Sequence, residues 1–342
     1  MPFDPFERVA VGRTDLRVTR LGLGGASIGG LFEAVPTDAA IGLVEHAWEI
    51  GVRSFDVAPL YGYGASERRL GHVLAARPRD EFVLSTKVGR LVRRAWSVKP
   101  GEDVDRQGDQ ARDDAFYAAT VGRRVVFDYS ADGVLRSVEA SLDRLGLDRI
   151  DILYIHDPDD HWQQALDGAY PVLDRLRRAG VVGAIGAGMN QTAMLTRFAT
   201  ETDIDVVLVA GRYTLLDQSA AEDLFPVCRA RGVAVIVGGV MNSGILADPG
   251  REARYDYRLA PAPMVERANR LEATCARHGV PLRVAAIQFP LAHPAVTGLV
   301  AGVRTGAHLD EYPAAMQADV PAGLWEELRA EALLEPGVPT PP

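Results

Sequence analysis

Eight short apolar runs alternate with amphipathic stretches along most of this 342-residue chain. Each run is rich in Val, Ile, Leu or Phe, which is typical of parallel strands that are buried on both faces. The runs are Leu21 to Leu23, Val52 to Phe55, Phe82 to Leu84, Ile150 to Ile155, Val182 to Ile185, Val206 to Val209, Val233 to Val237 and Val296 to Val300. Eight strands that each lead into a helix predict an α/β fold, a (β/α)8 TIM barrel, as a single domain over residues 1–342.

The stretches between these runs have the spacing of amphipathic helices. They are Thr37 to Glu49, Glu67 to Ala76, Val134 to Leu145, Trp162 to Ala179, Thr192 to Thr200, Ala220 to Arg231 and Pro263 to His278. Several end at a glycine that suits a left-handed cap, as at Gly51 and Gly232. The competing α/β fold, a doubly wound sheet, should show Gly-x-Gly-x-x-Gly after its first strand. Neither glycine-rich stretch, at Gly22 or at Gly183, has that spacing.

Two segments depart from the alternation. Val9 to Thr19 alternates around Gly12-Arg-Thr-Asp15, which predicts an N-terminal β-hairpin. Gly89 to Asp132 has no clean core pattern, although it is rich in Arg, Asp and aromatic residues. The latter include Arg93, Arg94, Trp96, Phe116, Tyr117, Phe127 and Tyr129. We expect a long loop after strand 3 that lies over the barrel mouth as a lid or binding element.

Four polar residues stand at or just after the ends of the predicted strands: Asp56, Tyr61, Lys87 and His156. In a barrel such strand ends converge on one face, so these side chains should meet in one pocket. A tyrosine has a pKa of roughly 10, and a lysine ammonium beside it should lower that value. A carboxylate should hold the lysine, and an imidazole should hydrogen-bond the reacting oxygen. None of these groups moves a hydride, so a nicotinamide cofactor is implied.

Charge and composition exclude several partners. The formal net charge of −9 should repel nucleic acid and anionic membranes. Cys228 and Cys275 have no Cys-x-x-Cys spacing, so neither a metal site nor a disulfide framework is indicated. No run approaches the roughly 18 apolar residues of a membrane span, and the N-terminus does not read as a leader. We expect a cytoplasmic protein that acts on a small molecule and whose oligomeric state the sequence leaves open.

The chain from about Val9 to about Leu328 resembles the aldo-keto reductase family. The resemblance is carried by Asp56-Val-Ala-Pro-Leu-Tyr61-Gly62, Ser66-Glu67, Lys87 and His156, in the order and spacing of the family's catalytic tetrad. It implies that Tyr61 is the general acid/base, that Lys87 and Asp56 tune it, and that His156 orients the substrate. It also implies a (β/α)8 barrel that binds NAD or NADP across its mouth.

The resemblance also implies cofactor-binding residues. Asn190 would hold the nicotinamide, with Tyr213 beside it, although Met189, Ala210 and Gly238 depart from the family's usual residues. The pyrophosphate would bind Asn242, Ser243 and Gly244. The adenosine end would lie at Gly302, Arg304, Thr305 and Glu311.

Three stretches, 186–191, 210–216 and 239–246, look like the branch that contains D-threo-aldose 1-dehydrogenase (L-fucose dehydrogenase) and pyridoxal 4-dehydrogenase. That likeness implies NAD(P)+-dependent oxidation of the anomeric carbon of an aldose, of L-fucose, D-arabinose or L-galactose type, to the lactone. Pyridoxal 4-dehydrogenation and NAD(P)H-dependent reduction of small aldehydes remain as alternatives. Outside enzymes, a cofactor-sensing binding protein remains.

Overall fold

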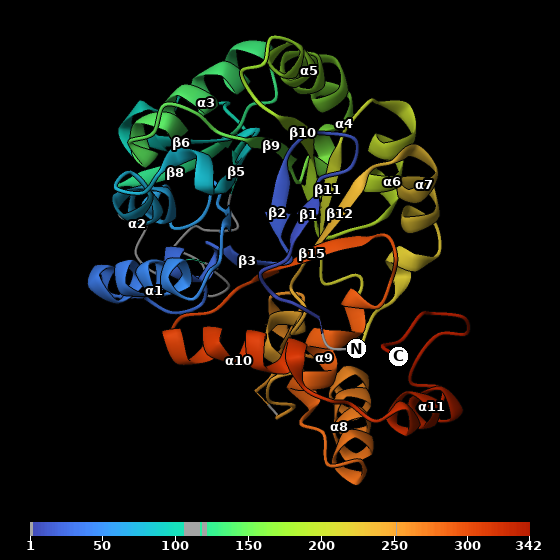
Figure 1. Ribbon diagram of the computed structural model, residues 1–342. Helices are drawn as coiled ribbons and strands as arrows, with labels where there is room; N and C mark the ends of the chain where they lie inside the picture. Colours follow the sequence, from blue (N-terminus) through green and yellow to red (C-terminus); the bar gives the residue numbers. More distant parts are fainter. Residues whose placement is uncertain (1–2, 106–116, 118–121, 251) are drawn as a thin grey trace.

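Eight parallel strands close into a barrel in the computed structural model, which describes residues 3–105, 117, 122–250 and 252–342. The strands are β3 (Leu21–Gly24), β4 (Ser54–Asp56), β5 (Val83–Val88), β9 (Ile152–His156), β10 (Ala184–Met189), β11 (Val206–Ala210), β12 (Ala234–Gly238) and β15 (Val296–Ala301). Each pairs with the next in this order, and β15 pairs with β3 (Figure 1). The predicted barrel is confirmed.

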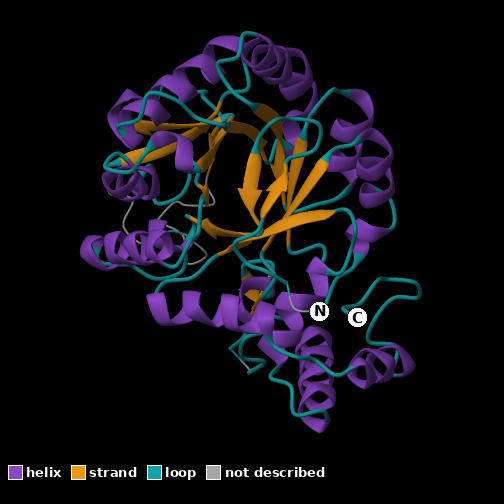
Figure 2. Cartoon of the chain, viewed as in Figure 1, coloured by secondary structure: helices purple, strands orange, loops and turns teal. Residues whose placement is uncertain are grey.

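Helices surround the barrel as an outer layer (Figure 2). They include α1 (Thr37–Glu49), α2 (Ala65–Leu74), α3 (Ala131–Leu145), α6 (Ala193–Glu201), α7 (Leu224–Arg231), α8 (Ala262–Arg277), α9 (Leu282–Leu291), α10 (Gly306–Gln317) and α11 (Ala322–Ala330). The stretch predicted as one helix from Trp162 contains α4 (Trp162–Gln164), a π-helical segment at Ala165–Ala169 and α5 (Tyr170–Arg178). Helix α9 has no amphipathic pattern, and so was not predicted, because it is buried on nearly every side.

The predicted hairpin is confirmed and closes the amino-terminal end of the barrel. Its strands are β1 (Arg8–Ala10) and β2 (Arg17–Thr19), paired antiparallel. Val11 and Val18 pack into the barrel interior with Tyr154 and other strand residues. The turn needs glycine at Gly12, where φ is +54° and a Cβ would lie 2.6 Å from the carbonyl oxygen of Asp205.

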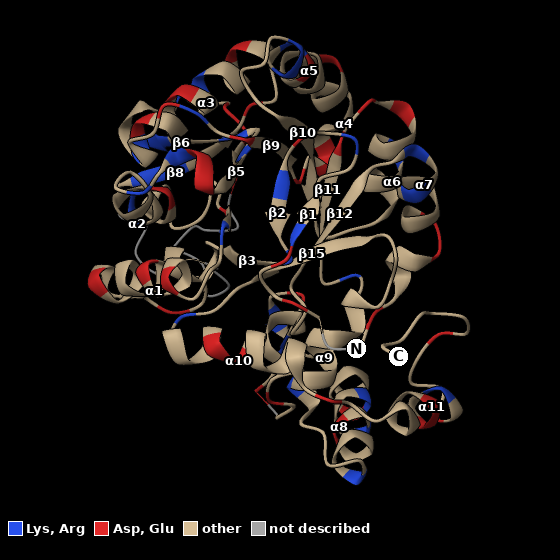
Figure 3. Cartoon of the chain, viewed as in Figure 1, with Lys and Arg blue, Asp and Glu red and all other residues tan. Residues whose placement is uncertain are grey.

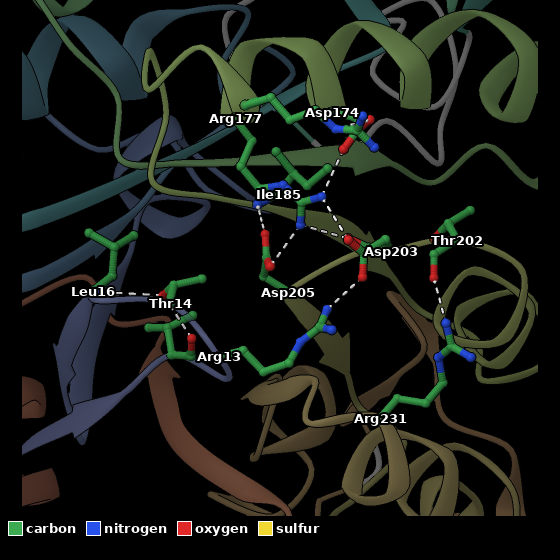
Figure 4. Close-up of polar contacts among 12 residues, drawn as sticks. Arg13, Thr14, Leu16, Asp174, Arg177, Ile185, Thr202, Asp203, Asp205 and Arg231 are labelled. Carbon is green, nitrogen blue, oxygen red and sulfur yellow. Dashed lines mark hydrogen bonds and ion pairs between the residues drawn. The ribbon is translucent and has the colours of Figure 1, made fainter.

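Ion pairs fix this hairpin to the loops beneath the barrel (Figure 4). Arg13 lies 2.7 Å from Asp203, which also pairs with Arg177. Arg177 donates to Asp205 at 2.8 Å, and the other oxygen of Asp205 accepts from the backbone N–H of Ile185. Because this end is sealed, the carboxyl ends of the strands form the open mouth.

The long connection expected after strand 3 is present, and it holds a three-stranded antiparallel sheet that the sequence did not predict. The strand order is β6 (Arg90–Arg94), β8 (Arg123–Phe127) and β7 (Val104–Asp105). Arginines interrupt the apolar pattern of β6 and β8, which Figure 3 shows as strongly basic, and β7 is too short to leave a sequence signal. Phe116 lies outside the described residues. We call residues 89–132 the insertion.

No helix within the described ranges combines the length and apolar character needed to cross a membrane. Cys228 and Cys275 are buried free thiols.

Candidate active site

The four residues singled out from the sequence come together at the barrel mouth. Asp56 is the last residue of β4, and His156 is the last residue of β9. Tyr61 lies on the turn that follows β4, where its N–H donates to the carbonyl of Ala58. Lys87 was expected after its strand, but it lies inside β5, because that strand continues to Val88.

A buried ion pair forms the floor of the site. Lys87 Nζ lies 2.6 Å from Asp56 Oδ2 and donates to the carbonyl of Val57 at 2.9 Å. The Ser85 hydroxyl donates to Asp56 Oδ1 at 2.7 Å, so both carboxylate oxygens have partners. Such saturation is what allows a charged pair to persist in a low-dielectric interior.

Tyr61 lies close to both Lys87 of this pair and His156. The ammonium of Lys87 lies 4.7 Å from the centre of the Tyr61 ring. The Tyr61 and His156 rings meet edge to face, with centroids 5.8 Å apart. The predicted constellation of carboxylate, amine, phenol and imidazole is therefore present in space.

The pKa of Tyr61 differs from the expectation. Burial raises the pKa of this phenol well above its ordinary value, and the charge of Asp56 raises it further. The expected lowering of the pKa by Lys87 is not found, because burial and the charge of Asp56 together outweigh the ammonium. In this state Tyr61 is a neutral phenol at neutral pH, ready to donate a proton, and it must first lose that proton to act as a base.

His156 is also uncharged at neutral pH. Burial lowers its pKa well below the ordinary value, and the nearby charges of Arg90 and Lys87 lower it further. Among the described residues its Nδ1 atom is buried without a hydrogen-bond partner, and Nε2 lies 3.5 Å from Asp157 Oδ2. A neutral imidazole donates one hydrogen bond and accepts another, which suits it to orient an oxygen without competing for the proton.

A cavity of about 450 Å³ opens beside Tyr61 and runs over the loops that follow β12 and β15. Its lining includes seven of the residues that the sequence assigned to a cofactor: Asn190, Asn242, Ser243, Gly244, Gly302, Arg304 and Glu311. The volume lies within the range of small-molecule sites.

The backbone of this cavity fits an extended dinucleotide. Asn242 and Ser243 have φ of +44° and +62°, a conformation that side-chain-bearing residues seldom adopt and that is common at ligand sites. Asn242 donates to the carbonyl of Gly211 at 3.0 Å, while its own Oδ1 is buried without a partner among the described residues. A Cβ at Gly244 would meet nothing within 4 Å, so the backbone faces open space. An unsatisfied buried acceptor is costly, so it indicates a ligand donor.

Two residues that the sequence assigned to the cofactor, Thr305 and Tyr213, do not line the cavity. Arg304 does line it, but the hydroxyl of the neighbouring Thr305 accepts from the N–H of His308 at 3.2 Å and caps α10. Tyr213 does not line the cavity at all. Its buried ring stacks on Phe289 at 5.2 Å and meets Phe225 at 4.7 Å, because the chain turns into the helix layer after Gly211.

Several residues at the barrel mouth were not predicted from the sequence. The Tyr257 hydroxyl donates to Asn190 Oδ1 at 3.0 Å, and the Tyr117 ring lies 6.2 Å from that of Tyr61. Tyr117 shows that the insertion does reach the mouth. Tyr257 sits between β13 (Arg254–Tyr255) and β14 (Arg258–Leu259), strands too short to leave a sequence signal.

Comparison with known proteins finds matches over nearly the whole chain. The model of the aldo/keto reductase family matches residues 20–330. The chain is 43% identical to D-threo-aldose 1-dehydrogenase of a Pseudomonas species, over 97% of this chain and 98% of that protein. It is 40% identical to pyridoxal 4-dehydrogenase of Microbacterium luteolum, over 96% and 98%.

Solved structures share the fold at low identity. An aldo-keto reductase of Bacillus halodurans (AKR11C1) superposes with a TM-score of 0.73 at 23% identity, over 97% of this chain and 98% of that one. A glycerol dehydrogenase of Gluconobacter oxydans (AKR11B4) gives 0.74 at 21% identity, over 98% and 97%.

Proposed function

Because the chain belongs to the aldo/keto reductase family, we propose that it oxidises the anomeric carbon of an aldose to the lactone. Family membership makes the protein an NAD(P)-dependent oxidoreductase. The observation that carries the reaction type is the buried Asp56–Lys87 pair beside Tyr61, with the His156 ring 5.8 Å from the Tyr61 ring. The choice of an aldose is supported by the 43% identity to D-threo-aldose 1-dehydrogenase.

Each of the four residues has a proposed task in the oxidation. Tyr61, once deprotonated, takes the proton of the anomeric hydroxyl, and His156 orients the same oxygen. Lys87 stabilises the phenolate, and Asp56 holds Lys87 in place. The cofactor, when bound, supplies the acceptor for the hydride that leaves the anomeric carbon. Loss of that hydride and of the hydroxyl proton leaves the lactone carbonyl.

The cavity supplies the proposed cofactor contacts. Asn190 holds the nicotinamide amide near Tyr61. Asn242, Ser243 and Gly244 receive the pyrophosphate. Gly302, Arg304 and Glu311 line the adenosine end.

Charge at the adenosine end leads us to propose that NAD+ serves at least as well as NADP+. In the described part of the chain two arginines line this end, and each is paired with a carboxylate. Arg304 lies 2.6 Å from Glu33, and Arg283 lies 2.7 Å from Glu311. A 2′-phosphate would have to displace those carboxylates and would be repelled by them.

Two substitutions test this proposal. Arg304→Ala is expected to raise KM for NADP+ about tenfold and to change KM for NAD+ less, because a charged hydrogen bond to the phosphate is lost. Glu33→Gln is expected to improve NADP+ binding, since it releases Arg304 from its exposed ion pair. The test compares KM for NAD+ and for NADP+ in the wild type and in both variants. A strong NADP+ preference in the wild type, or equal losses for both cofactors in Arg304→Ala, would contradict it.

The proposed activity is tested by following the absorbance of reduced nicotinamide with a substrate panel. L-Fucose, D-arabinose, L-galactose and pyridoxal are each offered with NAD+ and NADP+, and small aldehydes with the reduced cofactors. We expect the highest kcat/KM with one of the aldoses. Highest activity with pyridoxal, which the 40% identity to pyridoxal 4-dehydrogenase favours as the second candidate, would replace the aldose. Cofactor binding without turnover of any substrate would indicate a sensing protein.

We also propose that residues 1–342 act as one domain, in the cytoplasm, on a small-molecule substrate. Limited proteolysis that released a stable fragment would contradict the single domain.

A further inference from the structure

Asp157 links the insertion to the active site. It follows His156 at the end of β9, and its Oδ2 lies 3.5 Å from His156 Nε2. Its Oδ1 lies 3.4 Å from Nδ2 of Asn190. The Asp157 carboxylate therefore lies beside His156, which is proposed to orient the substrate oxygen, and beside Asn190, which is proposed to hold the nicotinamide.

Arg90 holds this carboxylate from the insertion. Its Nη2 donates to Asp157 Oδ2 at 3.1 Å, and its Nη1 donates to Asp105 Oδ2 at 2.8 Å. Its guanidinium lies 5.1 Å from the centre of the Phe127 ring. Arg90 and Asp105 are each 2% exposed. All three strands of the sheet thus contribute, with Arg90 from β6, Asp105 from β7 and Phe127 from β8.

The backbone at Asp157 is held in an unfavourable conformation. Its φ is +38°, which a residue with a side chain adopts only when its surroundings impose it. The Tyr129 hydroxyl lies 2.6 Å from the carbonyl oxygen of His156 and 3.0 Å from that of Asp157, so its one hydrogen is donated between them. The strained backbone, the two carbonyl contacts and the hydrogen bond from Arg90 all fix the place of the Asp157 carboxylate.

We propose that Arg90 is a positioning residue for the reaction, which acts through Asp157 to set the orientation of His156 and Asn190. The three-stranded sheet of the insertion is then part of the active site, where it aligns reacting groups as well as covering them. This inference rests on the proposed function, because it presumes the tasks given there to His156 and Asn190.

The charges around Asp157 make the inference testable by pH. Facing it are Arg90 from β6, Lys87 from β5, Asp105 from β7, Asp159 from the following loop and His156 from β9. Burial raises the pKa of Asp157 to about 6, and the charge of Arg90 opposes that rise. Without Arg90 the pKa moves higher, so Asp157 is protonated near neutral pH and no longer accepts from its neighbours. Its carboxylate returns as the pH is raised.

The experiment compares Arg90→Gln with the wild type in aldose oxidation across pH. We expect kcat/KM of the variant to fall on the order of 10²-fold at neutral pH, because a misplaced group costs rate without loss of contact area. The ratio of variant to wild-type kcat/KM should rise with pH. Arg90→Lys should recover part of the loss, since an ammonium pairs with one carboxylate but lacks the fork that spans two.

Three controls separate positioning from folding. Arg93→Gln, on the same strand and paired with Glu102, should leave kcat/KM unchanged. Asp157→Asn, which leaves Arg90 paired with Asp105, should retain the wild-type melting temperature yet lose activity. If Arg90→Gln does not fold, Asp157→Asn takes its place in the test. In the Arg90→Gln/Asp157→Asn double variant, the recovery at high pH should disappear.

A loss in Arg90→Gln that is equal at every pH, or is matched by Arg93→Gln, would overturn the inference. So would an active Asp157→Asn. These results are distinct from failure of the proposed function, which would appear as undiminished turnover in Tyr61→Phe.

Discussion

Tyr61→Phe is expected to lower kcat for aldose oxidation by roughly 10²-fold or more, the usual size of a general acid/base contribution. The substitution removes only the hydroxyl that takes the substrate proton. The ring keeps its contacts with Lys87 and His156, so cofactor affinity should stay close to that of the wild type. Steady-state kinetics together with cofactor titration by fluorescence measure the two quantities.

Tyr213→Phe is the matched control for this result. The Tyr213 hydroxyl is buried without a hydrogen-bond partner among the described residues, far inside the helix layer. Its removal should leave kcat unchanged and should not lower the melting temperature, because no bond is lost. Wild-type turnover in Tyr61→Phe would show that another group carries the proton. A large loss in Tyr213→Phe would restore Tyr213 to the site.

The barrel and its four polar residues were predictable because their signals are local. Each strand is a short apolar run, Asp56 and His156 follow such runs directly, and Tyr61 lies on the turn after the first of them. Parallel strands in a barrel must end on one face, so topology alone brings the four together. Lys87 was expected after its strand because the apolar run ends at Leu84. Strand β5 continues through polar residues to Val88, so Lys87 lies within it.

The insertion and its contacts were not predictable because their causes lie far apart in sequence. Arg90 donates to Asp157, which lies 67 residues later in the chain, and other arginines interrupt the apolar pattern of its strand. Nothing in the sequence shows that Asn242 adopts a left-handed backbone, since that conformation depends on the bond from its amide to Gly211. Tyr213 was assigned by resemblance, and packing against Phe225 and Phe289 decides its place instead.

The raised pKa of Tyr61 predicts how aldose oxidation depends on pH. Oxidation needs the deprotonated phenol, and burial moves that ionisation to higher pH. The rate of oxidation should therefore increase as pH rises from neutral, and the rate of aldehyde reduction, which uses the protonated phenol, should not. Measurement of kcat in both directions over the same pH series tests this. A maximum for oxidation below neutral pH would contradict it.

Lys87→Met is expected to affect both stability and chemistry. It leaves the Asp56 carboxylate buried without its cation, a change that costs about 3–5 kcal/mol of unfolding free energy in comparable pairs. The charge of Asp56 already raises the pKa of Tyr61, and without Lys87 nothing offsets it. The rising limb of aldose oxidation should therefore move to still higher pH, with a lower rate at neutral pH. Denaturant unfolding and the pH–rate profile measure the two effects.

The double variant Asp56→Asn/Lys87→Met separates these effects, because it removes both charges and keeps most of the packing volume. Its stability should recover toward that of the wild type, since a buried ion pair replaced as a whole often costs little. In the double variant the rate of oxidation should begin to rise at a lower pH than in Lys87→Met, because the carboxylate that opposes phenolate formation is gone. A Lys87→Met variant with reduced stability but a wild-type pH profile would show that the lysine supports the fold and leaves the proton affinity of Tyr61 to burial alone.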